Sequence, residues 1–291
     1  MKFSLIENLV NVDQLDKYAA IIGENPSNGA RSPDLWNSAF FEYGLNYRMV
    51  PLDVLKDNVL NLLDELSQDD NFIGGAIAAP YKEVVANWLG VNITPEASNI
   101  GAVNCLYRNN KGDLEGTNTD GEGALRSYEK EFGEVKGKRV IILGTGGAAK
   151  AVASYFSSGI GTQGEIRLVG RSKEGRSFAN KLNAKWADWN NLNNYLADAN
   201  IVINCTSLGF GKQVTLSPLN EGQIQRLNNK AVVFDIVYQP QNTLLLKIAR
   251  DNGKSFIGGL AMNLEQAVLA FNYTNYKLYD EAVTRAIMEK I

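Results

Sequence analysis

The chain has 291 residues, 45% of them apolar, and its 32 acidic side chains slightly outnumber its 29 lysines and arginines. That length suits one large domain or two medium ones, and two is the better interpretation. The near balance of charge excludes the global positive field that attracts nucleic acid or an anionic membrane, so we expect a small-molecule partner. The chain has no histidine, which excludes Ser-His catalysis and the commonest metal ligand. We therefore expect no metal site.

The cysteines and the amino terminus indicate a cellular location. Cys105 and Cys205 lie far apart in apolar runs, and a chain of this size needs no disulfide, so we interpret both as reduced core thiols. Charges interrupt the apolar residues of the first twelve positions, and no apolar run approaches the ~20 residues of a membrane span. We expect a soluble, cytoplasmic protein, either a monomer or a homodimer.

Short apolar runs alternate with helical periodicity along most of the chain, which is typical of βαβ units. In the first part the pattern predicts three strands, two helices and then a hairpin. The predicted strands are 18–23, 47–52 and 72–80, the helices are 33–43 and 54–66, and the hairpin turns near 109–112.

The composition changes at Asp120, and a second series of alternating elements follows. Buried strands and helices there are typical of a doubly wound, nucleotide-binding type of domain. The predicted strands are 140–143, 165–170, 199–206, 231–237 and 254–258, and the outermost helices are 123–132 and 263–289. The fold class is therefore α/β, with two domains.

The segment "VIILGTGGAAKA" places Gly144, Gly146 and Gly147 directly after a strand that is apolar on both faces. Such a turn lets backbone N–H groups approach a pyrophosphate at the positive end of the next helix. The alternative is a tight turn that binds nothing. A second strand about one βαβ unit later favours the dinucleotide site.

A cationic loop, "GRSKEGR", follows that second strand. An NAD site normally has an acidic residue here, whereas the 2′-phosphate of NADP needs cations. Arg171, Ser172 and Lys173, with Arg176 nearby, therefore predict NADP as the cofactor. The alternative is a solvated surface loop, because Glu174 lies within the cluster.

Lys82 and Asp120 each come at the end of a predicted element, where we expect them to face a cleft between the domains. A lysine ammonium beside a carboxylate can pass a proton to or from a reacting oxygen. Without histidine, this pair is the natural acid/base candidate. The alternative is a surface salt bridge.

Nine motifs in register resemble the shikimate dehydrogenase family, over roughly Tyr18 to Phe271. They include "AAPYKE", "IGAVNCL", "GTNTDGEG", "LGTGGAAKA", "INCTSLGF", "FDIVYQPQNTLLL" and "GGLAMNLEQA". The resemblance implies NADP-linked interconversion of 3-dehydroshikimate and shikimate, a step in aromatic amino acid biosynthesis, with Lys82 and Asp120 as the catalytic pair. It also implies a substrate-binding catalytic domain at 1–120, to which 258–291 returns, and a Rossmann-type NADP-binding domain at 121–257.

The resemblance also implies a set of binding residues, although each has a structural alternative as a cap, turn or core residue. The implied substrate-binding residues are Ser32, Asn104, Tyr238 and Gln266, and the implied cofactor-binding residues are Gly144, Gly146, Gly147, Ala148, Arg171, Thr206, Ser207 and Gly259.

Two positions depart from the family pattern. Ala30 replaces the first serine of the family's Ser-x-Ser-Pro stretch, and Ala78 replaces the threonine of its Asn-Val-Thr-x-Pro strand. Both hydroxyls contact the family's substrate, although Arg31 offers another route to a carboxylate. Three interpretations remain open: shikimate dehydrogenase, a family reductase with a different and less hydroxylated substrate, and a non-catalytic NADP-binding regulatory protein.

Overall fold

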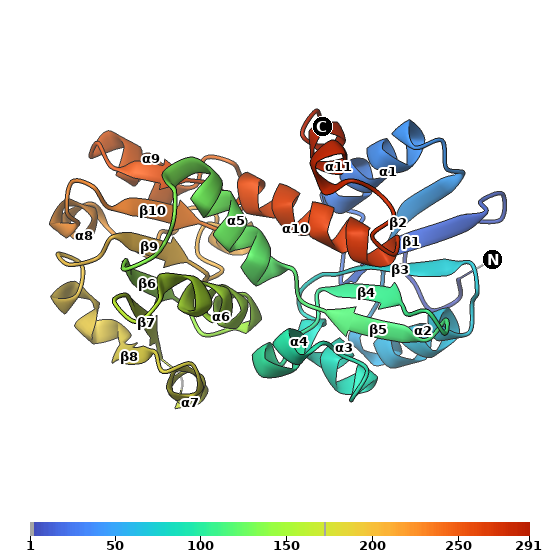
Figure 1. Ribbon diagram of the computed structural model, residues 1–291, viewed down its shortest axis with the longest axis horizontal. Helices are drawn as coiled ribbons and strands as arrows, with labels where there is room; N and C mark the ends of the chain where they lie inside the picture. Colours follow the sequence, from blue (N-terminus) through green and yellow to red (C-terminus); the bar gives the residue numbers. More distant parts are fainter. Residues whose placement is uncertain (1–2, 172) are drawn as a thin grey trace. The chain divides into compact units, whose positions relative to one another are not determined.

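The computed structural model describes residues 3–171 and 173–291 (Figure 1). The chain divides into two compact units, of which unit 1 comprises the residues up to Thr119 together with Gln266–Ile291, and unit 2 comprises Asp120–Glu265. Each unit has its own sheet. The predicted two-domain α/β class is confirmed, whereas the functional roles of the two domains stay predictions.

Unit 1 contains a mixed sheet of five strands in the order β2-β1-β3-β4-β5. The strand β1 (Lys17–Gly23) pairs in parallel with β2 (Tyr47–Asp53) and with β3 (Phe72–Ile77). The strands β4 (Cys105–Arg108) and β5 (Leu114–Thr117) form the predicted hairpin, with β4 antiparallel to both neighbours. The carboxyl ends of β1, β2, β3 and β5 therefore meet at one edge of the sheet, the unit 1 carboxyl edge.

Helices cover both faces of the unit 1 sheet. Apolar side chains at helical spacing in three helices, such as Leu62, Val85 and Ala97, pack into one core with the strands. In a separate aromatic cluster, the rings of Trp36 and Phe271 pack edge to face with their centroids 5.4 Å apart. This contact joins the first helix of the unit to the long C-terminal helix that carries Phe271. The helices of unit 1 are α1 (Ser32–Glu42), α2 (Val59–Ser67), α3 (Lys82–Leu89), α4 (Pro95–Ile100), the C-terminal part of α10 (Gly259–Thr274), and α11 (Glu281–Met288), with a 3-10 turn η1 (Lys56–Asn58).

Unit 2 contains a parallel sheet of six strands in the order β11-β10-β9-β6-β7-β8. The chain starts in the middle with β6, winds outward to β8, and then returns beside β6 as β9. The strand order therefore reverses between β6 and β9, which is the usual place for a ligand in such sheets. The strands are β6 (Arg139–Leu143), β7 (Glu165–Gly170), β8 (Lys185–Asp188), β9 (Ile201–Asn204), β10 (Val232–Asp235) and β11 (Ser255–Ile257).

The strands of unit 2 bury both faces because their side chains alternate between two cores. Val140 and Ile142 pack with α5 (Asp120–Phe132) and α6 (Gly147–Ile160). Ile141 packs into the opposite core, which the remaining helices cover. Those helices are η2 (Trp189–Asn194), α8 (Glu221–Arg226) and α9 (Leu244–Asp251), and unit 2 also contains α7 (Lys173–Lys181) and η3 (Gly211–Gln213).

Two predicted helices differ from the structure. The predicted helix 54–66 begins only at Val59, because Val54 still extends from β2 and its N–H donates to the Gly23 carbonyl at 2.9 Å. The predicted helix 263–289 is two helices, α10 and α11. Tyr276 and Lys277 have positive φ angles of 54° and 55°, which interrupts the helix, and Asp280 caps the start of α11.

None of the helices in the described part of the chain is both long enough and apolar enough to cross a bilayer. Within the same ranges, no three cysteine, aspartate or glutamate side chains form a group that could hold a metal ion.

Candidate active site

Several of the predicted site residues lie at the unit 1 carboxyl edge. Lys82 is half-buried and begins α3, shortly after β3 ends, and its carbonyl accepts the Val103 N–H at 2.9 Å. Asn104 is the residue after Val103 and directly precedes β4. Gln266 reaches the same place from α10, because its side-chain oxygen accepts from the Asn104 amide at 3.5 Å.

Asn104 is only 3% exposed and is held in one orientation by Thr119. The Thr119 N–H donates to Asn104 Oδ1 at 2.7 Å, and the Asn104 amide lies 3.1 Å from the Thr119 hydroxyl. Thr119 Oγ1 also lies 3.1 Å from the Gln266 carbonyl, to which it can donate. Thr119 therefore orients the side-chain amide of Asn104 and holds the backbone of Gln266. Thr119 was not predicted from the sequence, although the polar run "TNTD" at the end of a strand is a signal for such a residue.

Ser32 is the first residue of α1 and is buried, and Pro33 follows it. The loop that leads to it from β1 is anchored by Asp53, a buried carboxylate at the end of β2. Asp53 accepts the Ser27 N–H at 2.8 Å and also a short hydrogen bond from the Ser27 hydroxyl. Asp53 is another positioning residue that the sequence did not reveal, because Ser27 and Asp53 meet only through the pairing of β1 with β2.

The two substituted positions belong to this same edge. The Ala78 N–H donates to the Ile22 carbonyl at 2.8 Å, directly after β3, and the Ala30 N–H donates to the Pro26 carbonyl at 3.2 Å within the β1 loop. Both alanine side chains are half-buried. Gly23 packs closely against Ala78, because a Cβ on Gly23 would lie only 3.0 Å from the Ala78 Cβ.

The glycine turn of unit 2 joins β6 to α6 at the point where the strand order reverses. Gly144 has a φ of +114°, and a Cβ there would lie 2.9 Å from the Cys205 carbonyl oxygen, so a side chain is excluded. Gly146 caps α6 in an extended conformation with open space around it, and Gly147 and Ala148 form its first turn. The first N–H groups of this 14-residue helix have no side-chain cap among the described residues. They form a favourable place for an anion.

The cationic loop follows β7, the next strand of the sheet. Arg171 is exposed and comes directly after Gly170. Gly170 and Gly175 have no space for a side chain, because a Cβ on either would lie 2.5 Å or less from the Thr145 methyl group. The loop therefore packs against the glycine turn. Lys173 is the first residue of α7, and Ser172 lies outside the described residues.

Thr206 and Ser207 follow β9, and Asn204 organises the loop that they form. Asn204 Oδ1 accepts the Thr206 N–H at 3.0 Å and the Thr206 hydroxyl at 2.7 Å. The Thr206 hydroxyl in turn accepts the Leu208 N–H at 3.1 Å, and Ser207 donates to Gln213 at 2.8 Å. The two predicted cofactor-binding residues thus have a structural role in their loop.

Asp235 ends β10 and is fully buried. Its carboxylate accepts hydrogen bonds from Thr243 at 2.6 Å, Asn204 at 3.0 Å and the Val237 N–H at 3.1 Å. Burial raises the pKa of Asp235, although these three donors oppose the shift. Asp235 therefore fixes the loop that carries the half-buried Tyr238.

Gly259 begins α10 beside this loop. A Cβ on Gly259 would lie 2.3 Å from the Ile236 carbonyl oxygen, so only glycine permits the close approach. The carboxyl ends of β6, β7, β9, β10 and β11 thus bring the predicted cofactor-binding residues to one edge of the sheet, the unit 2 carboxyl edge.

Asp120, the predicted partner of Lys82, is the first residue of α5 and is 6% exposed. It belongs to unit 2, whereas Lys82 belongs to unit 1. Both cysteines are free, and burial raises the pKa of the Cys105 thiol to about 12 and also raises that of Cys205. Neither thiol is an activated nucleophile.

A doubly wound parallel sheet with a glycine turn at its strand-order reversal defines a dinucleotide-binding class of protein. Comparison with family models narrows the class. The shikimate dehydrogenase substrate-binding domain matches residues 21–106, and shikimate / quinate 5-dehydrogenase matches residues 126–243. The chain belongs to the shikimate dehydrogenase family.

Named relatives and solved structures agree with this assignment. A shikimate dehydrogenase (NADP(+)) of Methanocaldococcus jannaschii is 33% identical, covering 94% of this chain and 97% of the relative. One of Pyrococcus furiosus is 36% identical, covering 88% and 89%. A crystal structure of the Thermus thermophilus enzyme with NADP(H) and shikimate has a TM-score of 0.80 at 25% identity, covering 94% and 99%.

Proposed function

We propose that the protein is an NADP-dependent oxidoreductase that transfers a hydride between the cofactor and a ring carbon of a hydroxy-carboxylate, either shikimate or a close relative. The observation that carries this proposal is the unit 2 carboxyl edge, where the glycine turn, the exposed Arg171 and the Asn204 loop come together. Relatives named shikimate dehydrogenase (NADP(+)) support it.

The residues at this edge fit a dinucleotide phosphate. Gly144 and Gly259 keep side chains away from the edge, and Gly146 leaves open space in front of the uncapped start of α6. The pyrophosphate would be held there, with Gly147 and Ala148 supplying N–H groups. The guanidinium of Arg171 would pair with the 2′-phosphate, which distinguishes NADP from NAD. Thr206 and Ser207 would line the remaining cofactor surface.

Lys82 and Asp120 are the proposed proton-handling pair. Bound NADP⁺ supplies the hydride acceptor. As the alcohol is oxidised, Lys82 Nζ accepts the proton of the reacting hydroxyl, and it returns the proton in the reverse direction. The Asp120 carboxylate attracts the lysine ammonium and orients it.

The remaining predicted residues would bind the substrate. The Ser32 hydroxyl would donate to the carboxylate, while the amides of Asn104 and Gln266 would hold ring hydroxyls, with the Asn104 amide in the orientation that Thr119 imposes. Tyr238 contributes a further hydroxyl. These roles account for why the amides are fixed before any ligand arrives, because a preorganised site loses less entropy on binding.

A second candidate is a family member with a less hydroxylated substrate. Ala30 and Ala78 favour it, because both are half-buried at the unit 1 carboxyl edge and neither carries the hydroxyl that the family pattern has there. Without those donors, shikimate itself loses two hydrogen bonds.

One experiment separates these possibilities. Ring carboxylates with and without hydroxyls are assayed for NADP⁺ reduction, using the native protein, Lys82→Ala, and Lys111→Ala as a matched exposed lysine of unit 1. Turnover of shikimate supports the first candidate, and turnover only of less hydroxylated acids supports the second. No turnover of any of them, despite NADP⁺ binding, overturns both.

A further inference from the structure

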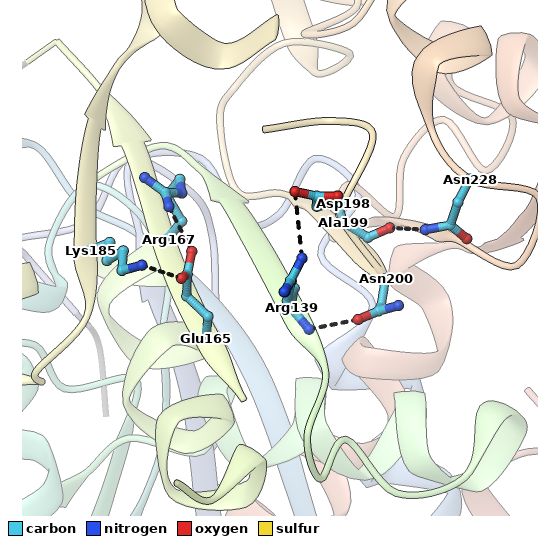
Figure 2. A network of polar contacts seen from close by, with 8 residues as sticks. All are labelled: Arg139, Glu165, Arg167, Lys185, Asp198, Ala199, Asn200 and Asn228. Carbon is cyan, nitrogen blue, oxygen red and sulfur yellow. Dashed lines mark hydrogen bonds and ion pairs between the residues drawn. The ribbon is translucent and has the colours of Figure 1, made fainter. Parts of the chain in front are cut away.

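The amino ends of the unit 2 strands carry a second group of charged side chains, at the opposite edge of the sheet from the glycine turn (Figure 2). It surrounds a cavity of about 250 Å³. We call this group the amino-edge cluster, and its members are Arg139, Glu165, Arg167, Lys185, Tyr195 and Asp198. Neither the glycine turn nor the proposed reaction uses it.

Arg167 is the central member, because its side chain is only 14% exposed and held in place. Its guanidinium lies over the Tyr195 ring, 3.7 Å from the ring centroid, and Nη2 donates to Glu165 at 2.6 Å. Among the residues that the structure describes, Glu165 is the one that accepts a hydrogen bond from this guanidinium. The guanidinium donors that Glu165 does not use remain for a ligand in the cavity, in a plane that the tyrosine ring fixes.

The charges of the cluster do not cancel. Glu165 uses both carboxylate oxygens, one on Arg167 and the other on Lys185 at 2.5 Å. Burial opposes its ionisation, but these two cations outweigh burial and hold the pKa of Glu165 below its usual value. Arg139 pairs loosely with Asp198, at 3.4 Å, with exposed fractions of 59% and 74%. Three cations against two carboxylates leave one positive charge.

Hydrogen bonds hold the backbone around the cavity. The Arg139 N–H donates to Asn200 Oδ1 at 2.8 Å, and the Asn228 amide donates to the Ala199 carbonyl at 2.5 Å (Figure 2). Tyr195 directly follows the 3-10 turn η2, and its N–H donates to the Leu192 carbonyl at 3.0 Å. The cavity is therefore formed before a ligand binds.

We propose that the amino-edge cluster is a binding site for a small oxyanion, the phosphate or carboxylate group of a metabolite. The guanidinium of Arg167 donates to such a group through the N–H groups that Glu165 does not use, and Lys185 and Arg139 lie at the cavity rim. One oxyanion offsets the excess positive charge. A cavity of about 250 Å³ accommodates a group of this size rather than a dinucleotide.

Ligand binding at this edge leaves the unit 2 carboxyl edge accessible, because the two lie at opposite ends of the same strands. The site therefore suits a ligand that binds together with the cofactor. This inference stands independently of the proposed reaction.

The test is a titration of backbone amide resonances with inorganic phosphate and, in a second arm, with succinate, at constant ionic strength set by chloride. The native protein and Arg171→Ala are both titrated, so that phosphate bound at the amino-edge cluster is distinguished from phosphate bound at the cationic loop. We expect saturable shifts at Arg139, Arg167 and Tyr195 that persist in Arg171→Ala. The arm with the lower dissociation constant identifies the preferred group.

The donors are then tested with two variants, Arg167→Lys and Lys185→Ala. The control is Arg250→Lys, because Arg250 also lies over an aromatic ring, that of Phe256 at 5.2 Å, but is not among the residues that line this cavity. We expect the first two to weaken binding at least about tenfold, the loss typical of a charge-assisted hydrogen bond, and the control to bind normally. The Lys185 side chain is 61% exposed, so we expect Lys185→Ala to fold normally. It therefore measures the contribution of this cation to oxyanion binding even if Arg167→Lys does not fold. No saturable shift at this edge, or equal binding by Lys185→Ala and the control, overturns the proposal.

Discussion

Restoring the two missing hydroxyls tests the substrate site in one variant, Ala30→Ser with Ala78→Thr. Both alanines are half-buried at the unit 1 carboxyl edge. Gly23 lies close to Ala78, since a Cβ on Gly23 would be only 3.0 Å from the Ala78 Cβ, so the folding of the threonine variant has to be measured together with its activity. If the native protein is adapted to another substrate, the variant should use shikimate better.

The expected gain follows from the groups involved. A hydroxyl that donates to the substrate carboxylate is worth about 1.5–3 kcal/mol, and one that contacts a ring hydroxyl about 0.5–1.5 kcal/mol. Together they amount to about 2 to 4.5 kcal/mol, or roughly 30- to 2000-fold in affinity. The gain should appear in KM if ground state and transition state are held equally, and in kcat if the contacts tighten during hydride transfer.

The assay is steady-state NADP⁺ reduction with shikimate, alongside thermal unfolding of variant and parent. Each single substitution is measured too, because the two positions contact different parts of the substrate. A folded double variant with no improvement, or a native protein that already has a micromolar KM for shikimate, would refute the substrate-change reasoning.

Four further outcomes are expected. Arg171→Ala should raise the NADPH dissociation constant at least about tenfold while leaving NADH binding nearly unchanged, and equal losses would remove this arginine from phosphate recognition. Lys82→Ala should lower kcat by about 100-fold or more with normal cofactor affinity, and near-normal turnover would exclude it from the mechanism. Asp53→Asn should raise KM more than it changes kcat, since it loosens the loop before Ser32; an unchanged KM would argue against that role. The pKa of Glu165 is lowered in the folded protein, so its contribution to stability is present above the unfolded-state pKa and is lost as the pH falls through the folded-state pKa. Glu165→Gln should therefore lower Tm by about 2–4 °C at pH 7 and by little at pH 3. An equal loss of Tm at both pH values would contradict the ion pairing.

The fold was predictable where burial alone determines the pattern. The strands of unit 2 are apolar on both faces, because each packs between two cores, and such runs stand out in a sequence. Gly144 was predictable because it follows such an apolar strand directly, within a cluster of glycines. In the structure a side chain at Gly144 would collide with the Cys205 carbonyl oxygen. The short edge strand β8, with charged residues at its ends, has no comparable pattern and was missed.

The residues that orient the site were harder to predict. Thr119, Asp53 and Asp235 act through partners that are distant in sequence, such as Gln266, which lies 147 positions from Thr119. Strand pairing brings Asp53 to the β1 loop and Asp235 to Asn204, whereas the helix α10 brings Gln266 to Thr119. The break between α10 and α11 was missed because the aromatic run at Tyr276 continues the apolar periodicity of a helix while the backbone turns.

The most direct test of the proposed function is single-turnover formation of NADPH, followed by absorbance, when native protein and NADP⁺ are mixed with shikimate or a less hydroxylated ring acid. We expect NADPH to form with at least one of these acids in the native protein and in Lys111→Ala, and to form at least about 100-fold more slowly in Lys82→Ala. NADPH formation at the same rate in all three proteins, or no formation with any acid although NADP⁺ binds, would contradict the proposal.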